Sequence, residues 1–245
     1  MTIHISLWSS PRNISTALMY SFAQRQDTKV VDEPLYAHYL SHSKAKDYHP
    51  GASEILASQE QDGEKVVREQ LLGAYDVPVV FFKNMTHHLI ELEWGFLALL
   101  KNVILTREPK GMLLSYSQQI SQPSLSDTGY AAQLKLVQYL EALGQEVIIV
   151  DSADILRQPR EMLGLLCERL GIVFDEKMLS WQAGARAEDG VWAKYWYANV
   201  HASSGFSPYQ ERDLELPLEL QKLYEQCLPY YQTLKAKCLR PQTSS

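Results

Sequence analysis

Five short apolar runs, each rich in residues that favour β-structure, recur along the chain and constrain its fold more than any other feature. They are nearly continuous in hydrophobic character, which is typical of strands covered on both faces of a parallel sheet. The runs are IHISLW (3–8), KVVDE (29–33), VPVVFFK (77–83), NVILTRE (102–108) and EVIIVDS (146–152). Helical patterns lie between them, so the sequence predicts a three-layer α/β fold with a mostly parallel central sheet and helices on both faces.

Helices are predicted where apolar residues repeat at helical spacing and where Pro or Gly marks an end. Two polar, weakly patterned segments, 41–63 and 117–129, are expected to be long surface loops. The tail 240–245 is expected to be frayed, and the absence of a linker predicts a single domain over 1–245. The predicted helices are 14–25, 130–144, 159–171 and 217–237, the last interrupted by Pro229.

Composition excludes several classes of protein. The net charge of −6 over 245 residues argues against a general nucleic-acid binder. The longest apolar stretch, LIELEWGFLALLKNVIL, contains two glutamates and a lysine, so no membrane span is expected, and the N-terminus is too polar for a signal peptide. Three scattered cysteines give neither a disulfide framework nor metal-ligand spacing. We therefore expect a cytoplasmic protein with reduced thiols and no bound metal.

The turn SSPRNISTAL (9–18) follows the first predicted strand and opens the first predicted helix. A helix N-terminus offers unpaired N–H donors and a positive dipole end, and both favour an anion. Ser15 and Thr16 supply hydroxyls, and Arg12 supplies a charged fork suited to phosphate or sulfate. The turn lacks glycine and the signature G-x-x-x-x-G-K-[ST], which argues against an NTP-hydrolysing loop. The alternative is an ordinary capped turn that binds nothing.

A second strand and helix, NVILTREPKGMLLSYSQQI (102–120), repeat this arrangement. Arg107 ends the strand, Pro109 suits the first helical turn, and Ser115 follows Arg107 by eight residues. Both polar side chains are placed to meet an anion at the end of the strand. The alternative for Arg107 is a surface ion pair, and for Ser115 a solvated or backbone-bonded hydroxyl.

Three segments, in order, resemble the sulfotransferase family. SSPRNISTAL resembles its 5′-phosphosulfate loop, roughly Y-P-K-S-G-T-T-W, and TREPKGMLLSY (106–116) resembles its 3′-phosphate motif, R-[DN]-P-x-x-x-x-x-S-x. Residues 155–179 resemble a later helix of the pattern P…L…LC..LGI.F. In the loop, arginine stands where the family usually has lysine, as in bacterial sulfotransferase-like proteins with an R-x-x-S-T loop.

The resemblance implies a P-loop NTPase-like sheet that does not hydrolyse nucleotide. It also implies 3′-phosphoadenosine 5′-phosphosulfate (PAPS) as cosubstrate, 3′-phosphoadenosine 5′-phosphate (PAP) as product, and no metal. The two anionic ends of PAPS match two separate strand–turn–helix sites. The 3′-phosphate would be held by Arg107 and Ser115, and the 5′-phosphosulfate by Arg12, Asn13, Ile14, Ser15 and Thr16.

Sulfuryl transfer needs a base for the acceptor's proton and a cation for developing charge; Arg12 is one candidate cation. KVVDEPLYAHYL (29–40) resembles the family's glutamate form of the catalytic base, which makes Glu33 the candidate; the alternative is that Asp32 and Glu33 only cap the next element. FFKNMTHHL (81–89) resembles K-T-H-L, so Lys83 is the candidate electrostatic helper. His87 is a further candidate, although it and His88 stand four and five residues after the lysine rather than two.

EDGVWAKYWYANVHASSGF (188–206) resembles the family's late Gly-rich, Trp-containing loop over the nucleotide. Trp192 would then stack on adenine; the alternative is that the aromatic residues belong to the core.

The prediction is a sulfotransferase that moves a sulfuryl group from PAPS to a hydroxyl or amine of a small-molecule acceptor, without nucleic acid or membrane as partner. One alternative is a nucleotide-dependent small-molecule kinase, with Asp151 as the acid that holds Mg²⁺. The other is a non-catalytic nucleotide-binding module on the same fold.

Overall fold

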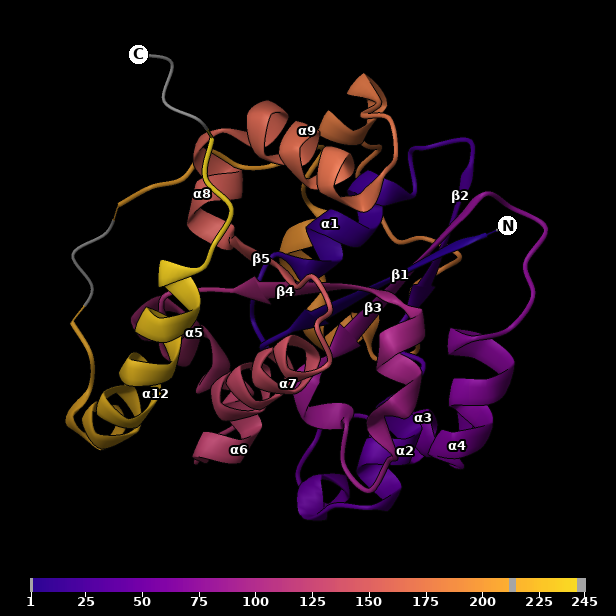
Figure 1. Cartoon of the computed structure of the whole chain (residues 1–245). Helices are drawn as coiled ribbons and strands as arrows, with labels where there is room; N and C mark the ends of the chain where they lie inside the picture. The colour runs from indigo at the N-terminus through magenta and orange to yellow at the C-terminus, as the bar shows by residue number, and fades with distance from the viewer. Residues whose placement is uncertain (1, 212–214, 242–245) are drawn as a thin grey trace.

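The computed structural model describes residues 2–211 and 215–241. A five-stranded sheet in the order β2-β3-β1-β4-β5 runs through the centre, and every pair is parallel (Figure 1). All five predicted strands are confirmed, with ends that differ by one or two residues from the apolar runs. The strands are β1 (Ile3–Ser9), β2 (Thr28–Asp32), β3 (Val79–Met85), β4 (Lys101–Thr106) and β5 (Ile148–Asp151).

Helices cover both faces of the sheet, as the sequence predicts. Figure 1 shows α1, α8 and α9 on one face and α7 with α2 to α4 on the other. The α-helices are α1 (Ser15–Phe22), α2 (Tyr36–Ser41), α3 (Ala52–Ser58), α4 (Gly63–Val66), α5 (Pro109–Tyr116), α6 (Leu125–Thr128), α7 (Tyr130–Ala142), α8 (Ser152–Arg157), α9 (Pro159–Leu170), α10 (Ala193–Trp196), α11 (Ala198–His201) and α12 (Leu218–Ala236). Short 3-10 or π turns are η1 (Lys44–Asp47), η2 (Val67–Leu71), η3 (Thr86–His88), η4 (Trp94–Leu99) and η5 (Glu176–Leu179).

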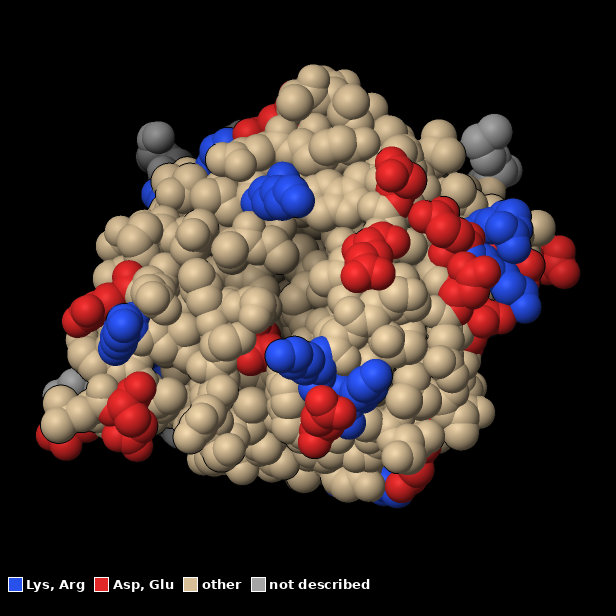
Figure 2. Space-filling model, turned by 90° about the horizontal axis from the view of Figure 1, so that it is seen from below, with Lys and Arg blue, Asp and Glu red and all other residues tan. Residues whose placement is uncertain are grey.

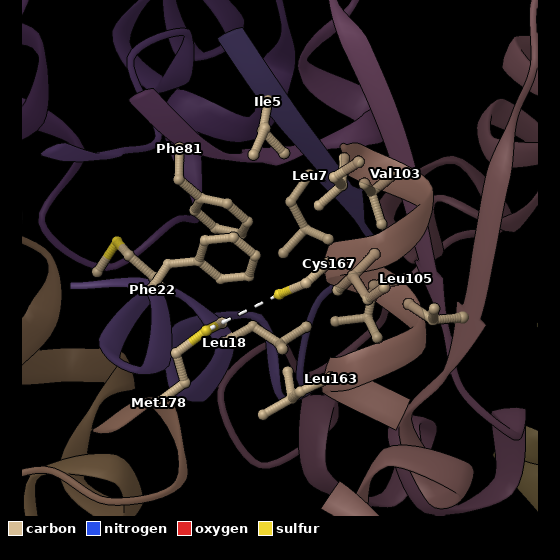
Figure 3. Close-up of a cluster of buried hydrophobic side chains, with 14 of the residues drawn as sticks. Ile5, Leu7, Leu18, Phe22, Phe81, Val103, Leu105, Leu163, Cys167 and Met178 are labelled. Carbon is tan, nitrogen blue, oxygen red and sulfur yellow. Dashed lines mark hydrogen bonds between the residues drawn. The ribbon is translucent and has the colours of Figure 1, made fainter. Parts of the chain in front are cut away.

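Alternate side chains of the central strands pack into two separate hydrophobic cores, one on each face of the sheet. Leu7 of β1 packs with Phe22 of α1 under α9, whereas Trp8 packs with the residues of α7 on the opposite face. Figure 3 shows the first core, where the rings of Phe22 and Phe81 stack with centroids 4.1 Å apart. Burial on both faces explains why the strands read as continuous apolar runs rather than as alternating ones.

Two segments expected to be loops contain helices. In 41–63 the structure forms η1 and α3, and in 117–129 it forms α6. The prediction of a long loop is therefore wrong for 41–63, whereas in 117–129 only the four residues of α6 depart from it. Ile55 of α3 is fully buried and packs in a satellite cluster with Tyr36 and Trp192. So few apolar residues anchor these short helices that no periodic pattern is visible in the sequence.

The sequence predicts an interruption of the C-terminal helix at Pro229, and this prediction is wrong. α12 runs continuously from Leu218 to Ala236 with the proline inside it. Leu220, Leu223 and Cys227 bury one face, and this packing keeps the helix intact where the proline removes a backbone N–H. The end of the predicted frayed tail, residues 242–245, lies outside the described residues.

The sheet topology fixes where a ligand can bind. All strands point the same way, so their carboxyl ends share one edge. β1 is followed by a helix on one face, and its neighbour β4 leads to α7 on the other. Such a switch point opens a crevice beyond the strand ends. Figure 2 shows the face on which α2, α3 and α6 lie, with a hollow near its middle and a mostly uncharged surface around it. Within the described ranges, no helix is long and apolar enough to cross a membrane.

Candidate functional site

The conformation of the turn between β1 and α1 is fixed by hydrogen bonds of its own side chains. Arg12 adopts a φ of 52°, in the left-handed region that side chains other than glycine rarely enter. Asn13 Nδ2 donates to the carbonyl of Leu105 at 3.1 Å, and Asn13 Oδ1 accepts from the N–H of Ile14 at 2.9 Å. The loop is thus tied to β4 by a side chain instead of being shaped by glycines. Ile14 itself packs against the first core, so it supports the loop rather than facing a ligand.

The two predicted anion-binding turns are in direct contact. Arg12 Nε donates to Ser115 Oγ at 2.9 Å, and Arg107 Nη1 donates to the carbonyl of Arg12 at 2.6 Å. Tyr130 OH, from α7, donates to the carbonyl of Arg107 at 2.7 Å. β1 and β4 are hydrogen-bonded neighbours, so residues 95 positions apart in sequence meet here. The structure therefore brings Arg12, Arg107 and Ser115 together.

In the part of the chain that the structure describes, neither of these guanidinium groups forms an ion pair. Among residues 2–211 and 215–241, neither Arg12 nor Arg107 has a carboxylate within ion-pair distance, whereas Arg25, Arg157 and Arg169 do. Burial and the repulsion of Arg107 lower the pKa of Arg12, and burial lowers the pKa of Arg107. Both side chains are half-buried, and like charges removed from water in this way are costly unless an anion joins them. The residues present therefore fit a doubly anionic ligand beside the N-terminus of α1.

Glu33 and Lys83 meet in a buried network next to this turn. Lys83 Nζ, on β3, contacts the Glu33 carboxylate, and it donates to Asp32 Oδ1 at 2.9 Å and to Tyr197 OH at 2.6 Å. Tyr197 OH also lies 2.8 Å from Asp32 Oδ2, and Trp192 Nε1 donates to Tyr197 OH at 3.0 Å. β2 pairs with β3 so that Asp32 faces Lys83 across the sheet, which brings all these groups to one strand end.

The network perturbs the protonation of Glu33. Burial raises the pKa of the Glu33 carboxyl, Lys83 opposes this shift and Asp32 adds to it, and the net pKa is about 7. Burial disfavours the charged ammonium of Lys83, but Asp32 and Glu33 outweigh burial and raise the pKa of Lys83. Glu33 also has a φ of 40°, which is a strained backbone conformation for a residue other than glycine. A carboxylate that titrates near neutral pH suits proton transfer.

The two histidines after β3 lie inside the protein. Burial lowers the pKa of His87 to about 3 and lowers that of His88 well below its usual range, so both imidazoles are neutral at pH 7. The ring of His88 lies between those of Tyr36 and Tyr39, with centroids 4.9 and 4.7 Å away. His87 lines the same cavity as Glu33. Neutral histidines at this position do not supply a cation for the chemistry.

The late aromatic segment covers the site, but with a different tryptophan from the one expected. Trp192 is only 2 % exposed and packs with Tyr36 and Tyr197, which favours the core alternative for it. Trp196 is the residue against the loop: its carbonyl accepts from Arg12 Nη1 at 3.1 Å, and the Arg12 guanidinium lies 5.8 Å from its ring.

A cavity of about 90 Å³ joins the loop to the buried network. The predicted residues Arg12, Asn13, Ser15, Thr16, Glu33, Lys83 and His87 all line it. Sequence reasoning missed Tyr116, His49 and Tyr197. Tyr116 directly follows Ser115 in the recognised motif, which is a signal that could have found it. His49 lies in a segment expected to be loop and gives no such signal.

Asp151, the candidate acid of the kinase alternative, has structural partners. Its Oδ1 accepts from the N–H of Ala153 at 2.8 Å at the start of α8, and its Oδ2 accepts from Tyr231 OH at 3.0 Å. Lys235 Nζ lies 3.3 Å from its carboxylate. The side chain of Asp151 is fully buried, and its partners on α8 and α12 give it a structural role.

The fold is of the three-layer α/β class, with the candidate site at the carboxyl ends of its parallel strands. The family model described as "Sulfotransferase domain" matches residues 3–238, and the chain belongs to this family. Solved structures with the same fold include the sulfotransferase domain of the Synechococcus PCC 7002 olefin synthase (TM-score 0.55, 17% identity, covering 92% of this chain and 95% of that one). A sulfotransferase from Alicyclobacillus acidocaldarius is also similar (TM-score 0.51, 15% identity, 96% of each chain).

Two curated relatives come from Arabidopsis thaliana. They are named branched-chain-amino-acid aminotransferase-like proteins 2 and 1, and each is 38% identical, over 232 and 234 residues respectively. These matches cover 94% and 95% of this chain but only 41% of each relative. The chain thus spans about two fifths of the length of these proteins.

Proposed function

We propose that this protein transfers a sulfuryl group from PAPS to a hydroxyl or amine of a small molecule. One observation carries the proposal: the uncompensated Arg12 and the base candidate Glu33 line a single cavity, at the switch point of a sulfotransferase-family sheet. A site for an anionic donor and a site for proton removal are thus next to each other. Structures of this fold and the family match support the sulfuryl chemistry.

Several residues would hold the donor. Arg12, Ser15 and Thr16 would bind the 5′-phosphosulfate with the N-terminus of α1, while Arg107 and Ser115 would bind the 3′-phosphate. When bound, PAPS supplies an activated sulfuryl group whose leaving group is the 5′-phosphate of PAP. The existing bond from Arg12 to Ser115 keeps the two phosphate-binding elements in register before any ligand arrives.

Glu33 would act as general base. As the acceptor oxygen or nitrogen forms its bond to sulfur, the bond from sulfur to the 5′-phosphate oxygen breaks and Glu33 takes the acceptor's proton. Arg12 would stabilise the charge that develops on the transferred and leaving oxygens. Lys83, held by Asp32 and Tyr197, would fix the orientation of the Glu33 carboxylate.

Transfer of ³⁵S from labelled PAPS to an acceptor panel tests this proposal. We expect labelled product with the wild-type protein and a loss of about 10²–10⁴-fold in rate for Glu33→Gln, which keeps the shape of the side chain but removes the base. Glu188→Gln, a change on the segment that precedes Trp192, serves as the matched control and should keep wild-type rates. Equal rates for Glu33→Gln and the wild type would remove Glu33 from this role.

A further inference from the structure

One wall of the cavity carries buried polar atoms that have no hydrogen-bond partner among the described residues. His49 Nε2, His87 Nδ1 and Tyr116 OH are buried, line the cavity and make no hydrogen bond within the described part of the chain. His49 and His87 are 8 % exposed, and Tyr116 is 1 % exposed. Buried polar groups without partners are rare because each one costs free energy. His88 Nδ1 and Trp196 Nε1, on two further lining residues, also have no partner in that part of the chain, and such a group of atoms around one cavity indicates a ligand with matching polar groups.

His49, His87 and Tyr116 are all uncharged at neutral pH. Burial lowers the pKa of His49 to about 4 and that of His87 to about 3, and it raises the pKa of Tyr116 well above its usual range. An imidazole or a phenol in its neutral form can both donate and accept a hydrogen bond. Hydroxyl groups have the same dual capacity, so they are the natural complement of this wall.

The ionised groups of this part of the cavity are already committed to one another. Lys83 is bound by Asp32 and Glu33, and within the described residues no other charged side chain lines the cavity except Arg12 at the loop. A carboxylate or ammonium on the acceptor would therefore be buried without a counter-charge on this wall, which is unfavourable. This wall therefore disfavours an acceptor that carries a charge.

The available space is small. An apolar cavity of about 150 Å³ holds one benzene molecule, so a cavity of this size holds no more than about six non-hydrogen atoms of an acceptor. Tyr36, Tyr116 and Trp196 enclose it with aromatic rings.

Resting on the proposed function, we propose that the acceptor is a small, uncharged polyhydroxyl compound. One hydroxyl lies at Glu33 and reacts, while its other hydroxyls bond to His49, His87 and Tyr116. Tyr116, His49 and His87 are then specificity-determining residues for the acceptor.

The test uses matched sets of compounds. Polyols of two and three carbons are compared with the hydroxy acid and the amino alcohol of the same carbon frame, and PAP release from PAPS is measured for each. Calorimetric titration with PAP is run beforehand, so that a failure of donor binding is recognised separately as a failure of the proposed function. We expect the neutral member of at least one set to react ten or more times faster, in kcat/KM, than its charged counterparts.

A single-atom variant tests the wall itself. Tyr116→Phe removes a hydroxyl that has no partner, so a purely structural role predicts unchanged or slightly higher thermal stability and unchanged kinetics. A role in acceptor binding predicts a KM for the best polyol that rises about three- to tenfold, with PAP affinity unchanged. Tyr75→Phe, which removes a hydroxyl bonded to the carbonyl of Gln70 outside the cavity, is the control and should leave KM unchanged.

The outcomes divide cleanly. Preference for a neutral polyol together with the KM effect of Tyr116→Phe supports the proposal. A charged member that reacts as well as its neutral partner in every set overturns it. Donor binding without turnover of any polyol, or an unchanged KM in Tyr116→Phe, overturns it as well.

Discussion

Replacing Asp32 by asparagine should make Glu33 a stronger acid. Both carboxylates contact the same ammonium of Lys83, so their charges lie within about 6 Å of each other. At an effective dielectric constant of about 20, that repulsion is about 3 kcal/mol, which corresponds to about two units in the pKa of Glu33. Asparagine has nearly the same shape, and its one oxygen can still accept from Lys83 and Tyr197 at the position of Oδ1, while the acceptor for the N–H of Gly190 is lost.

The assay is the pH dependence of kcat/KM. Because the base acts when ionised, wild-type activity should fall as the pH drops below about 7, the value to which the pKa of Glu33 is raised. In Asp32→Asn this acid limb should move about one to two pH units lower. Asp154→Asn on α8, away from the cavity, should leave it in place. An acid limb in Asp32→Asn that stays where it is, or that moves to higher pH, would refute the assigned coupling between Asp32 and Glu33.

Three further changes test the packing and electrostatics. Lys83→Met leaves two buried carboxylates without their cation, and should lower the free energy of unfolding by about 3–5 kcal/mol in a denaturant titration at pH 8. His87 has a folded pKa depressed from 6.5 to about 3, so the unfolded chain binds its proton first and stability falls as the pH drops below 6.5. Between pH 7 and pH 5 the wild type should therefore lose roughly 2 kcal/mol more than His87→Gln. Gly51→Ala should lower the melting temperature by several degrees, because Gly51 has a φ of 74° and its added Cβ would lie 2.4 Å from the ring of Tyr195.

The strands and the site loops were predictable because each leaves a local signal. A strand buried on both faces appears as an unbroken apolar run, and Arg12, Arg107 and Ser115 stand at the ends of such runs or in the helix that follows. Parallel strands bring such residues to one edge regardless of their separation in sequence. This is why Glu33 and Lys83, 50 positions apart, could be placed near the same site before any geometry was known.

Other features depend on tertiary packing and leave no local pattern. The short helices of 41–63 are held by a few buried residues such as Ile55, and α12 passes through Pro229 because its buried face holds it together. The sequence could not show that Trp196, rather than Trp192, contacts the loop. The segment contains several aromatic residues of similar chemistry, and its path in the fold decides which of them reaches the loop. The contacts of Asp32 with Lys83 and Tyr197 likewise appear only once the strands are paired.

The central claim is that Arg12 and Arg107 bind the two anionic ends of one donor molecule, Arg12 the 5′-phosphosulfate and Arg107 the 3′-phosphate. Calorimetric titration of PAP into the wild type, Arg107→Ala and Arg160→Ala tests it most directly, since Arg160 is an exposed arginine on α9 that pairs with Glu176. Loss of one buried, charge-assisted contact of about 2–3 kcal/mol predicts binding about 30- to 150-fold weaker in Arg107→Ala. Arg160→Ala should bind PAP as the wild type does. No binding of PAP to the wild type, or equal affinity in Arg107→Ala, would contradict the account.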